Sequence, residues 1–513
     1  MSNELFAVID VGSSMLTLKI AEFSRKQPPK VIETVRGSLA LGIDTYNERG
    51  ISQKSINRCY EILKGFSNKL EEYQVSPSEC RCVATSAIRE AQNKDYFLLQ
   101  IRERTGFQIE VLDNSIERYY HNLAISESIG EFRELIDQGA VILDIGAGSI
   151  QVSVYDRGRC MLSQNLLLGA LRVNELLDSL RDRTHDYVSL LDEYVSSEIN
   201  DFLMLAATSV YYPNMIVLAT GSSYLKRFAG LRRNQTIIEI DDLNTMFDYV
   251  MRVQPLQMSL QNGVPADIAE IMLPTTMIIQ KYADHNRLDR IFMPRVDLAD
   301  GLLTAAAVKE HRYKPSYDHT EDTVAIARHL AARFRFDYDH AKAVEGFCLK
   351  LFDVLKRPYG LTDRQRLLLQ LATILHDIGK FIHMNHHAHR SYNIISSIEM
   401  IGISEEERTT VAWLARLHSS DRLPDADALS GISFEQREEI LKLASILRIC
   451  DALDASHRQK FVAMTPRIKN EVLQFRFESH EDITMEEAAF DLKSQMFTAV
   501  YGLRVELKKI KSR

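Results

Sequence analysis

The fold is decided by the stretch Asp10-Val11-Gly12-Ser13-Ser14 and by its counterpart Asp144-Ile145-Gly146-Ala147-Gly148-Ser149. Each follows an apolar run typical of a β-strand, Leu5 to Ile9 in the first case and Ala140 to Leu143 in the second. Glycine tolerates positive φ and has no Cβ, so backbone N–H groups in such a turn can surround an oxyanion. The preceding aspartate can hold a divalent cation or position a water molecule. The repetition predicts one phosphate-binding loop built twice, in successive α/β units.

The composition is that of a folded protein with several domains. The chain has 513 residues, of which 45% are hydrophobic and 26% charged, and this length exceeds what one hydrophobic core usually organises. The net charge of −8, from 62 basic and 70 acidic residues, argues against broad duplex-DNA binding. No run approaches 18 apolar residues and no leader precedes the first strand, so we expect a cytoplasmic protein. The six cysteines form no zinc pattern and are expected to be reduced thiols.

The apolar periodicity divides the chain into four expected parts. Residues 1–125 and 126–312 are expected to form the two lobes of an actin-like (ribonuclease H-like) ATPase core, an α/β fold with ligand phosphates between the lobes. The second lobe includes a predicted helix from Tyr187 to Ala207. From residue 313 the β pattern nearly vanishes, and helices such as Arg364 to His376 and Glu405 to His418 predict an all-α domain over 313–465. Residues 466–513 are expected to form a small C-terminal α/β module.

The first 310 residues contain, in order, four blocks that resemble the exopolyphosphatase/guanosine pentaphosphatase (Ppx/GppA) family. The blocks are Ala7-Val8-Ile9-Asp10-Val11-Gly12-Ser13, Ala84-Thr85-Ser86-Ala87-Ile88-Arg89-Glu90-Ala91, Ile109-Glu110-Val111-Leu112 leading to Glu117, and Asp144-Ile145-Gly146-Ala147-Gly148-Ser149. The T-S-A-x-R-E-A block is the most specific of them. A later stretch, Asp451 to Lys460, is similar to the D-x-L-D-x-S-H-R-Q-K block of longer family members, so the resemblance spans nearly the whole chain.

The resemblance implies roles for individual residues. Glu117 would be the general base that activates water, and Asp144 would support the metal. Arg89 and the loops would hold the terminal phosphates, and the loop residues are Gly12, Ser13, Ser14, Gly146, Ala147, Gly148 and Ser149. A Mg²⁺ or Mn²⁺ ion would lie in the cleft near Asp10, Asp144 and Gln151. Hydrolysis of a phosphoanhydride needs mainly positioning, charge neutralisation and one oriented water molecule, which these residue types supply.

Several positions depart from the family pattern. Ser14 and Met15 stand where the family usually has Asn and Ser, and Ile150-Gln151 stands where it usually has Thr-Glu. Glutamine keeps an oxygen ligand but loses the charge, so metal affinity should fall. The late G-x-R-E-G segment of the family is matched by Gly301-Leu302-Leu303-Thr304-Ala305, without its Arg and Glu. These departures favour an alternative to catalysis, a regulatory protein that binds polyphosphate or (p)ppGpp.

The helical region carries a second signal, Leu375-His376-Asp377-Ile378-Gly379-Lys380, which resembles the helix end of HD-type metal phosphohydrolases. His340 and Asp451 resemble the first and last ligands of that type, and the four residues His340, His376, Asp377 and Asp451 would hold a transition metal. His319 is a rival for the first ligand. A second metal or a phosphate could be served by His386, His387, His389 and His418. In many family members this region instead serves dimerisation and chain guidance.

These observations favour a metal-dependent hydrolase that releases terminal phosphate from polyphosphate or from guanosine pentaphosphate. Two alternatives remain open: a regulatory binding protein with a weakened cleft, and a phosphohydrolase that acts through the HD-type site. The expected partners are inorganic polyphosphate or guanosine penta- or tetraphosphate, with no nucleic acid and no membrane, and a homodimer is expected.

Overall fold

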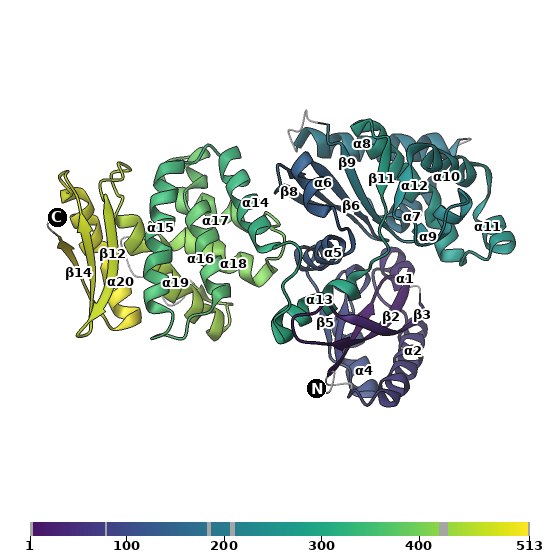
Figure 1. Cartoon of the computed structure of the whole chain (residues 1–513), viewed down its shortest axis with the longest axis horizontal. Coiled ribbons are helices and arrows are strands. Elements are labelled where there is room, and N and C mark those ends of the chain that lie inside the picture. Colours follow the sequence, from purple (N-terminus) through teal and green to yellow (C-terminus); the bar gives the residue numbers. More distant parts are fainter. Residues whose placement is uncertain are drawn as a thin grey trace. The chain divides into compact units, whose positions relative to one another are not determined.

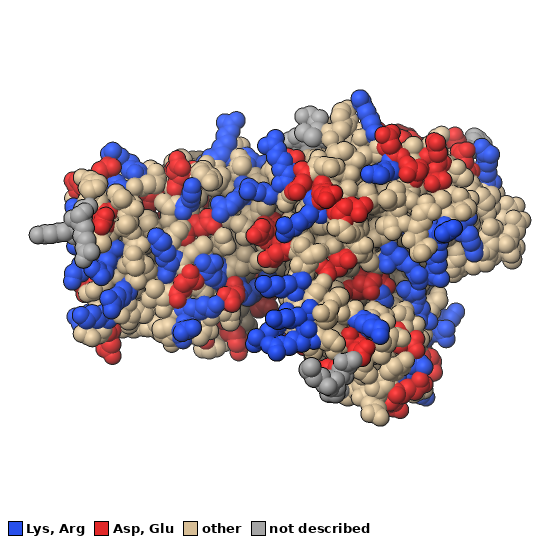
Figure 2. All heavy atoms as spheres, in the orientation of Figure 1, with Lys and Arg blue, Asp and Glu red and all other residues tan. Residues whose placement is uncertain are grey.

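The structure is a computed structural model that describes residues 4–39, 41–76, 80–181, 186–205, 211–419 and 429–510. The chain divides into two compact units, Met1–Asp322 and Thr323–Arg513, and each is described by itself. Figure 1 shows the elements of both units. On the face drawn in Figure 2, acidic and basic side chains are interspersed. Among the described residues, no helix combines the length and the apolar composition needed to cross a bilayer.

The first unit begins with a five-stranded sheet in the order β3-β2-β1-β4-β5. Its strands are β1 (Glu4–Val11), β2 (Met15–Phe23), β3 (Lys30–Ser38), β4 (Cys80–Ala84) and β5 (Ile109–Val111). The helices of this part are α1 (Leu41–Glu48), α2 (Gln53–Glu72), α3 (Ser86–Arg89), α4 (Lys94–Thr105) and α5 (Asn114–Ser128). Alternate residues of β1 serve the two faces of the sheet: Ile9 packs in the core with α2 and α4, whereas Val8 packs on the opposite face.

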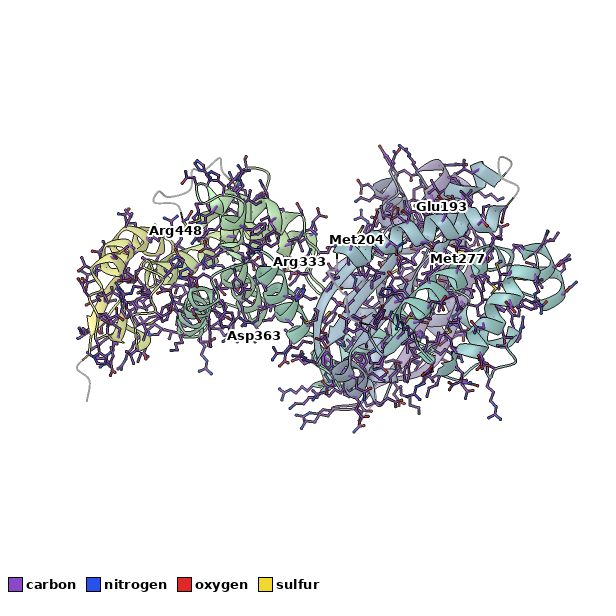
Figure 3. The ribbon with its side chains drawn as sticks, turned by 90° about the horizontal axis from the view of Figure 1, so that it is seen from above. Glu193, Met204, Met277, Arg333, Asp363 and Arg448 are labelled. Atoms are coloured by element: carbon purple, nitrogen blue, oxygen red, sulfur yellow. The ribbon has the colours of Figure 1, made fainter. Side chains whose placement is uncertain are left out.

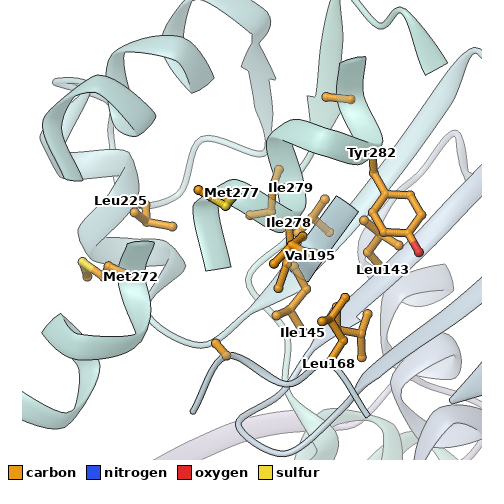
Figure 4. Packing of buried hydrophobic residues seen from close by; sticks show 14 of the residues in the cluster. Leu143, Ile145, Leu168, Val195, Leu225, Met272, Met277, Ile278, Ile279 and Tyr282 are labelled. Carbon is orange, nitrogen blue, oxygen red and sulfur yellow. The ribbon is translucent and has the colours of Figure 1, made fainter. Parts of the chain in front are cut away.

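The second sheet of this unit has six strands in the order β10-β11-β9-β6-β7-β8. Its strands are β6 (Ala140–Ile145), β7 (Ile150–Asp156), β8 (Arg159–Leu166), β9 (Asn214–Ala219), β10 (Ile237–Glu239) and β11 (Arg290–Phe292). The helices are α6 (Phe132–Gln138), α7 (Ala170–Arg181), α8 (Tyr187–Leu205), α9 (Ser222–Phe228), α10 (Ile240–Arg252), α11 (Pro255–Asn262) and α12 (Ala266–Asn286). Figure 4 shows Leu143 and Ile145 of β6 packed with Val195 of α8 and Ile278 of α12. Ala206 and Ala207, the predicted end of α8, lie outside the described residues.

The two sheets repeat one topology. The order β3-β2-β1-β4-β5 recurs as β8-β7-β6-β9-β11, with antiparallel pairing between β1 and β2 and between β6 and β7. The next neighbours, β4 and β9, run parallel to β1 and β6. The duplicated loops therefore occupy equivalent positions, at the end of the first strand of each sheet.

One helix returns from the second half of the unit to the first sheet. Helix α13 (Leu298–His311) packs through Leu298, Leu302 and Leu303 on the face of the first sheet that carries Val8. A Cβ atom at Gly301 would lie 1.9 Å from the carbonyl oxygen of Tyr120, so α13 and α5 touch backbone to backbone. The predicted second lobe, residues 126–312, does not anticipate this crossing, because apolar periodicity does not specify which sheet a helix covers.

The second unit is mostly helical. It contains most of α14 (Thr320–Arg333), and then α15 (Tyr338–Leu355), α16 (Asp363–Leu375), the short 3₁₀ helix η2 (Ile378–Phe381), α17 (His387–Ser396), α18 (Glu405–Leu417) and α19 (Phe434–Ala452). The bounds of α16 and α18 lie within one residue of the predicted helices. A three-stranded sheet, β12 (Ala463–Lys469), β13 (Val472–Glu478) and β14 (Arg504–Lys509), follows with α20 (Thr484–Tyr501). Strand β12, which begins within the range predicted to be helical, was not anticipated.

Candidate functional site

The two glycine-rich loops form the same turn. In the first, the N–H of Gly12 donates to the carbonyl of Met15 at 3.0 Å, and in the second the N–H of Gly146 donates to that of Ser149 at 3.0 Å. Both bonds close the hairpin between the first two strands of a sheet. The N–H groups of Gly12 and Gly146 are thus used inside the turn. The N–H groups of the residues between remain the candidates.

Loops from the two halves of the unit meet around Tyr46 of α1. The Tyr46 hydroxyl donates to Ser86 Oγ at 3.0 Å, and Ser86 Oγ lies 3.1 Å from Ser13 Oγ. On the other side, a Cβ atom at Gly148 would lie 2.1 Å from the Tyr46 oxygen, so only glycine permits this approach. The Arg172 guanidinium covers the Tyr46 ring at 4.8 Å, and its Nε donates to the Gly148 carbonyl at 2.7 Å. Tyr46 and Arg172 were not predicted from the sequence, because their contacts exist only in the assembled fold.

Three carboxylates converge on a histidine that the sequence analysis also missed. Glu117 lies in the first turn of α5, where a negative charge is favourable, and His121 follows one turn later on the same face. His121 Nδ1 forms an ion pair with Asp144, at the end of β6. Burial opposes the charged imidazole, but the negative charges of Asp144, Glu117 and Asp10 outweigh it and raise the pKa of His121 to about 9. The spacing Glu117 to His121 is the sequence signal that could have identified this residue.

Buried oxygen atoms without a hydrogen-bond donor among the described residues include Asp10 Oδ1 and Gln151 Oε1. Gln151 is 4% exposed and lies directly opposite Asp144 in the β6–β7 register, so the two side chains share a face of the sheet. Burial, together with the negative charges of Asp297 and Glu117, raises the pKa of Asp10 to about 7. Unpaired oxygen atoms beside carboxylates are what a hard cation such as Mg²⁺ requires, so this donor set fits one.

Arg89 is already engaged by its neighbours. Its Nη1 donates to Glu117 Oε2 at 3.0 Å and to the Leu112 carbonyl at 2.5 Å, and its Nη2 donates to Asn114 Oδ1. The side chain is 18% exposed. Arg89, the predicted phosphate-binding residue, thus lies beside Glu117, the predicted base, and its guanidinium group contacts the start of α5.

A buried lysine links α13 to the same region. Lys19 of β2 is 6% exposed, and its Nζ lies 2.7 Å from Asp297 Oδ1 and 2.6 Å from Asp300 Oδ1. The two aspartates also cap α13 reciprocally through backbone N–H groups. Because the charge of Asp297 acts on Asp10, this triad adjoins the three carboxylates. A charged residue inside an apolar strand is a signal that the sequence analysis could have used.

In the second unit, the four predicted metal ligands of the helical region come together. His340 of α15, His376 and Asp377 at the end of α16, and Asp451 of α19 are all buried, and His340, His376 and Asp451 offer ligand atoms within 4.8 Å of one another. His418, at the end of α18, forms a similar group with His376 and Asp377. Of the other three histidines that could serve a second metal or phosphate, His387 lies 3.3 Å from Asp377 Oδ1, whereas His386 and His389 are exposed. His319 lies in the other unit, where Asp322 and Ser126 bind its ring nitrogens.

A buried arginine fixes the end of α18. Arg448 of α19, labelled in Figure 3, is 1% exposed, and its Nη1 donates to the carbonyl of Leu417 at 3.1 Å. The bond holds the residue that precedes His418. The position of His418 is therefore set by buried contacts rather than by an exposed helix end.

Comparisons with known proteins agree with this architecture. The model of the Ppx/GppA phosphatase family matches residues 20–310, and that of Ppx/GppA phosphatase, domain III, matches residues 323–494. A guanosine-5'-triphosphate,3'-diphosphate pyrophosphatase from Photobacterium profundum is 24% identical over 476 residues, which cover 89% of each chain.

Two solved structures share the fold. The crystal structure of an exopolyphosphatase from Cytophaga hutchinsonii has a TM-score of 0.52 and 18% identity, covering 61% of this chain and 99% of its own. The Aquifex aeolicus member of the Ppx/GppA family has a TM-score of 0.50 and 19% identity, covering 60% of this chain and 99% of its own. The repeated sheets, the paired loops and the family matches lead to one conclusion: the chain belongs to the Ppx/GppA phosphatase family.

Proposed function

We propose that the chain hydrolyses the terminal phosphoanhydride bond of inorganic polyphosphate or of a guanosine pentaphosphate. The observation that carries this proposal is the ion pair of His121 with Asp144, next to the second glycine-rich loop, together with the negative charges of Asp10 and Glu117 that also raise the pKa of this imidazole. The names of the Photobacterium relative and of the Cytophaga structure support a guanosine polyphosphate and polyphosphate respectively. Both substrates end in the same terminal phosphate, so one site serves either.

In the proposed reaction, a water oxygen attacks the terminal phosphorus while the Glu117 carboxylate takes a proton from that water. The P–O bond to the next phosphate breaks, and the products are inorganic phosphate and a chain or nucleotide shorter by one phosphate. Some of the guanidinium N–H groups of Arg89 would turn from Glu117 toward the phosphate oxygens, a contact that suits a planar guanidinium. The N–H groups of the loop residues between Gly12 and Met15 and between Gly146 and Ser149 would bind the remaining oxygens.

Asp10, Asp144 and Gln151 are the residues that would hold Mg²⁺ or Mn²⁺. The support is the pair of buried, unpaired oxygen atoms of Asp10 and Gln151 beside the Asp144 carboxylate. When bound, the cation supplies charge neutralisation at the terminal phosphate. The amide of Gln151 contributes an oxygen without charge, so the affinity should be lower than with a third carboxylate.

The test measures phosphate release from long-chain polyphosphate and from guanosine pentaphosphate, with Mg²⁺ and with Mn²⁺. Wild type is compared with Asp144→Asn, which changes the cleft, and with the double variant His376→Ala/Asp377→Ala, which changes the helical unit. The proposal requires that Asp144→Asn loses activity and that the double variant keeps it. The reverse pattern would place the chemistry in the helical unit.

A second candidate is a regulatory protein that binds these phosphates without hydrolysing them. The observation that favours it is Gln151, a neutral side chain directly opposite Asp144. Binding of either phosphate compound with no release of phosphate, under any of the four metal and substrate combinations, would support this candidate.

The expected homodimer remains a prediction.

A further inference from the structure

The helical unit contains a second group of convergent side chains, beyond the proposed cleft. Six residues contribute to it: His340, His376, Asp377, His387, His418 and Asp451. They come from the first turn of α15, the end of α16, the start of α17, the end of α18 and the last turn of α19. Five helices that are distant in sequence therefore place imidazole and carboxylate groups at one point.

The histidine rings are fixed so that Nε2 points inward. The Nδ1 atom of each ring bonds to an oxygen at 2.6 to 3.1 Å. The pairs are His340 with Asp454 Oδ2, His376 with the Thr373 carbonyl, His387 with the Met384 carbonyl and His418 with the Ala415 carbonyl. Since Nδ1 carries the proton in this arrangement, Nε2 presents a lone pair, as metal-ligating histidines do.

Five of the six pairs among four of these atoms have the spacing of one coordination shell. His340 Nε2 lies 3.3 Å from His376 Nε2, and these two lie 3.2 and 3.6 Å from Asp451 Oδ1. Asp377 Oδ2 lies 3.8 and 3.6 Å from the same two nitrogens. Metal–ligand bonds of about 2.0–2.2 Å in a tetrahedron put the ligand atoms about 3.3–3.6 Å apart. The observed distances match this within about 0.2 Å.

Three further atoms outline a second, open shell. His387 Nε2, His418 Nε2 and Asp377 Oδ1 are separated by 3.3, 3.3 and 3.4 Å. These are the distances of one face of a tetrahedron, with the fourth position left to a water molecule or substrate, as in catalytic metal sites. Asp377 Oδ1 is a buried oxygen with no hydrogen-bond donor among the described residues.

We propose that the helical unit binds two divalent transition-metal ions, bridged by Asp377 through its two carboxylate oxygens. His340, His376 and Asp451 complete the closed site, and His387 and His418 complete the open one. Mixed imidazole and carboxylate ligands suit Mn, Fe, Co, Ni or Zn better than Ca. Lys493 pairs with Asp451 Oδ2 and leaves Asp451 Oδ1 turned toward the histidines. Lys380 pairs with Asp377 Oδ2, the same oxygen that faces His340 and His376, and so helps to hold this carboxylate in place.

The test measures metal content in the full-length protein. Protein stripped of metal with a chelator is reloaded with Mn²⁺, dialysed and analysed for its metal content. Because the proposed cation site of the first unit is the same in all variants, differences in metal content between them report on the helical unit. We expect wild type to hold two more equivalents than Asp377→Asn and one more than His418→Ala. His389→Ala, which alters an exposed histidine of the same helix as His387, should retain the wild-type content.

A second readout checks the bridge. Two Mn²⁺ ions that share a carboxylate are magnetically coupled, so the electron paramagnetic resonance spectrum of the wild type should differ from that of His418→Ala, which retains one ion. Far-UV circular dichroism establishes that each variant is folded, and His387→Gln replaces any variant that is not. Metal content in Asp377→Asn equal to that of wild type would overturn the proposal. A loss of one equivalent in both Asp377→Asn and His418→Ala, or an uncoupled spectrum, would overturn the two-ion bridge.

Discussion

Replacing Gly169 by alanine tests whether the second loop contacts the substrate. Gly169 is buried beneath that loop, and a Cβ atom there would lie 2.2 Å from both the carbonyl carbon of Gly148 and the nitrogen of Ser149. Ordinary contact begins at 3.4 Å, so the loop must move by about 1.2 Å, the difference between these distances. A misplacement of about 1 Å in a reacting group can cost about 10²-fold in rate. We therefore expect kcat/KM for phosphate release to fall about 10²-fold, with a loss of about 1–3 kcal/mol in the free energy of unfolding.

The assay is initial-rate phosphate release with saturating Mg²⁺, accompanied by urea unfolding. Gly65→Ala is the matched control, because Gly65 lies on the exposed face of α2 with no atom within 4 Å of the added Cβ. This control should keep full activity and gain about 0.5–1 kcal/mol of stability. A folded Gly169→Ala variant with wild-type kcat/KM would refute the reasoning, since the loop would then move without consequence for the reaction.

Three further predictions concern Gln151, Lys19 and His121. Gln151→Glu should lower the Mg²⁺ concentration needed for half-maximal activity, and an unchanged or higher requirement would place this residue out of the cation's reach. Lys19→Met should reduce the free energy of unfolding by up to about 3 kcal/mol. This is the low end of the range for a broken buried ion pair, because Asp297 and Asp300 are partly exposed. Urea unfolding measures the change, and an unchanged midpoint would contradict the prediction. The pKa of His121 is raised from 6.5 to about 9, so its contribution to stability is complete below pH 6.5 and is lost as pH rises through about 9. The free energy of unfolding is measured for wild type and for His121→Asn in the presence of a chelator, and the difference between the two should decline as pH rises across this interval. A difference that does not change with pH would show that the ion pair does not form.

The regular elements could be predicted where one apolar face dominates. In α16, for example, Leu368, Leu371 and Leu375 are buried at helical spacing, and the predicted bounds were confirmed to within one residue. Strand β12 was missed because it contains Pro466, a residue that rarely occurs inside strands; proline is tolerated there because β12 is an edge strand. The return of α13 to the first sheet could not be predicted either, since the local apolar periodicity of a helix does not specify which distant sheet it packs against.

The site was predictable where a motif ends a strand or starts a helix. Glu117 lies at the start of α5 as expected, and the family matches confirm the resemblance that singled it out. The roles assigned to Glu117 and Arg89 stay predictions. Tyr46 and Arg172 escaped notice because each interacts with a loop from the other half of the unit, which only the folded chain brings near.

The most direct test of the central proposal is a single-turnover measurement on Glu117→Gln. Excess enzyme is mixed with guanosine pentaphosphate and Mg²⁺, and the rate constant for phosphate release is measured beside the dissociation constant of the same compound. If Glu117 is the base, the rate constant falls about 10²–10⁴-fold while the affinity stays nearly unchanged. A Glu117→Gln variant that releases phosphate at the wild-type rate would contradict the account and remove Glu117 from the chemistry.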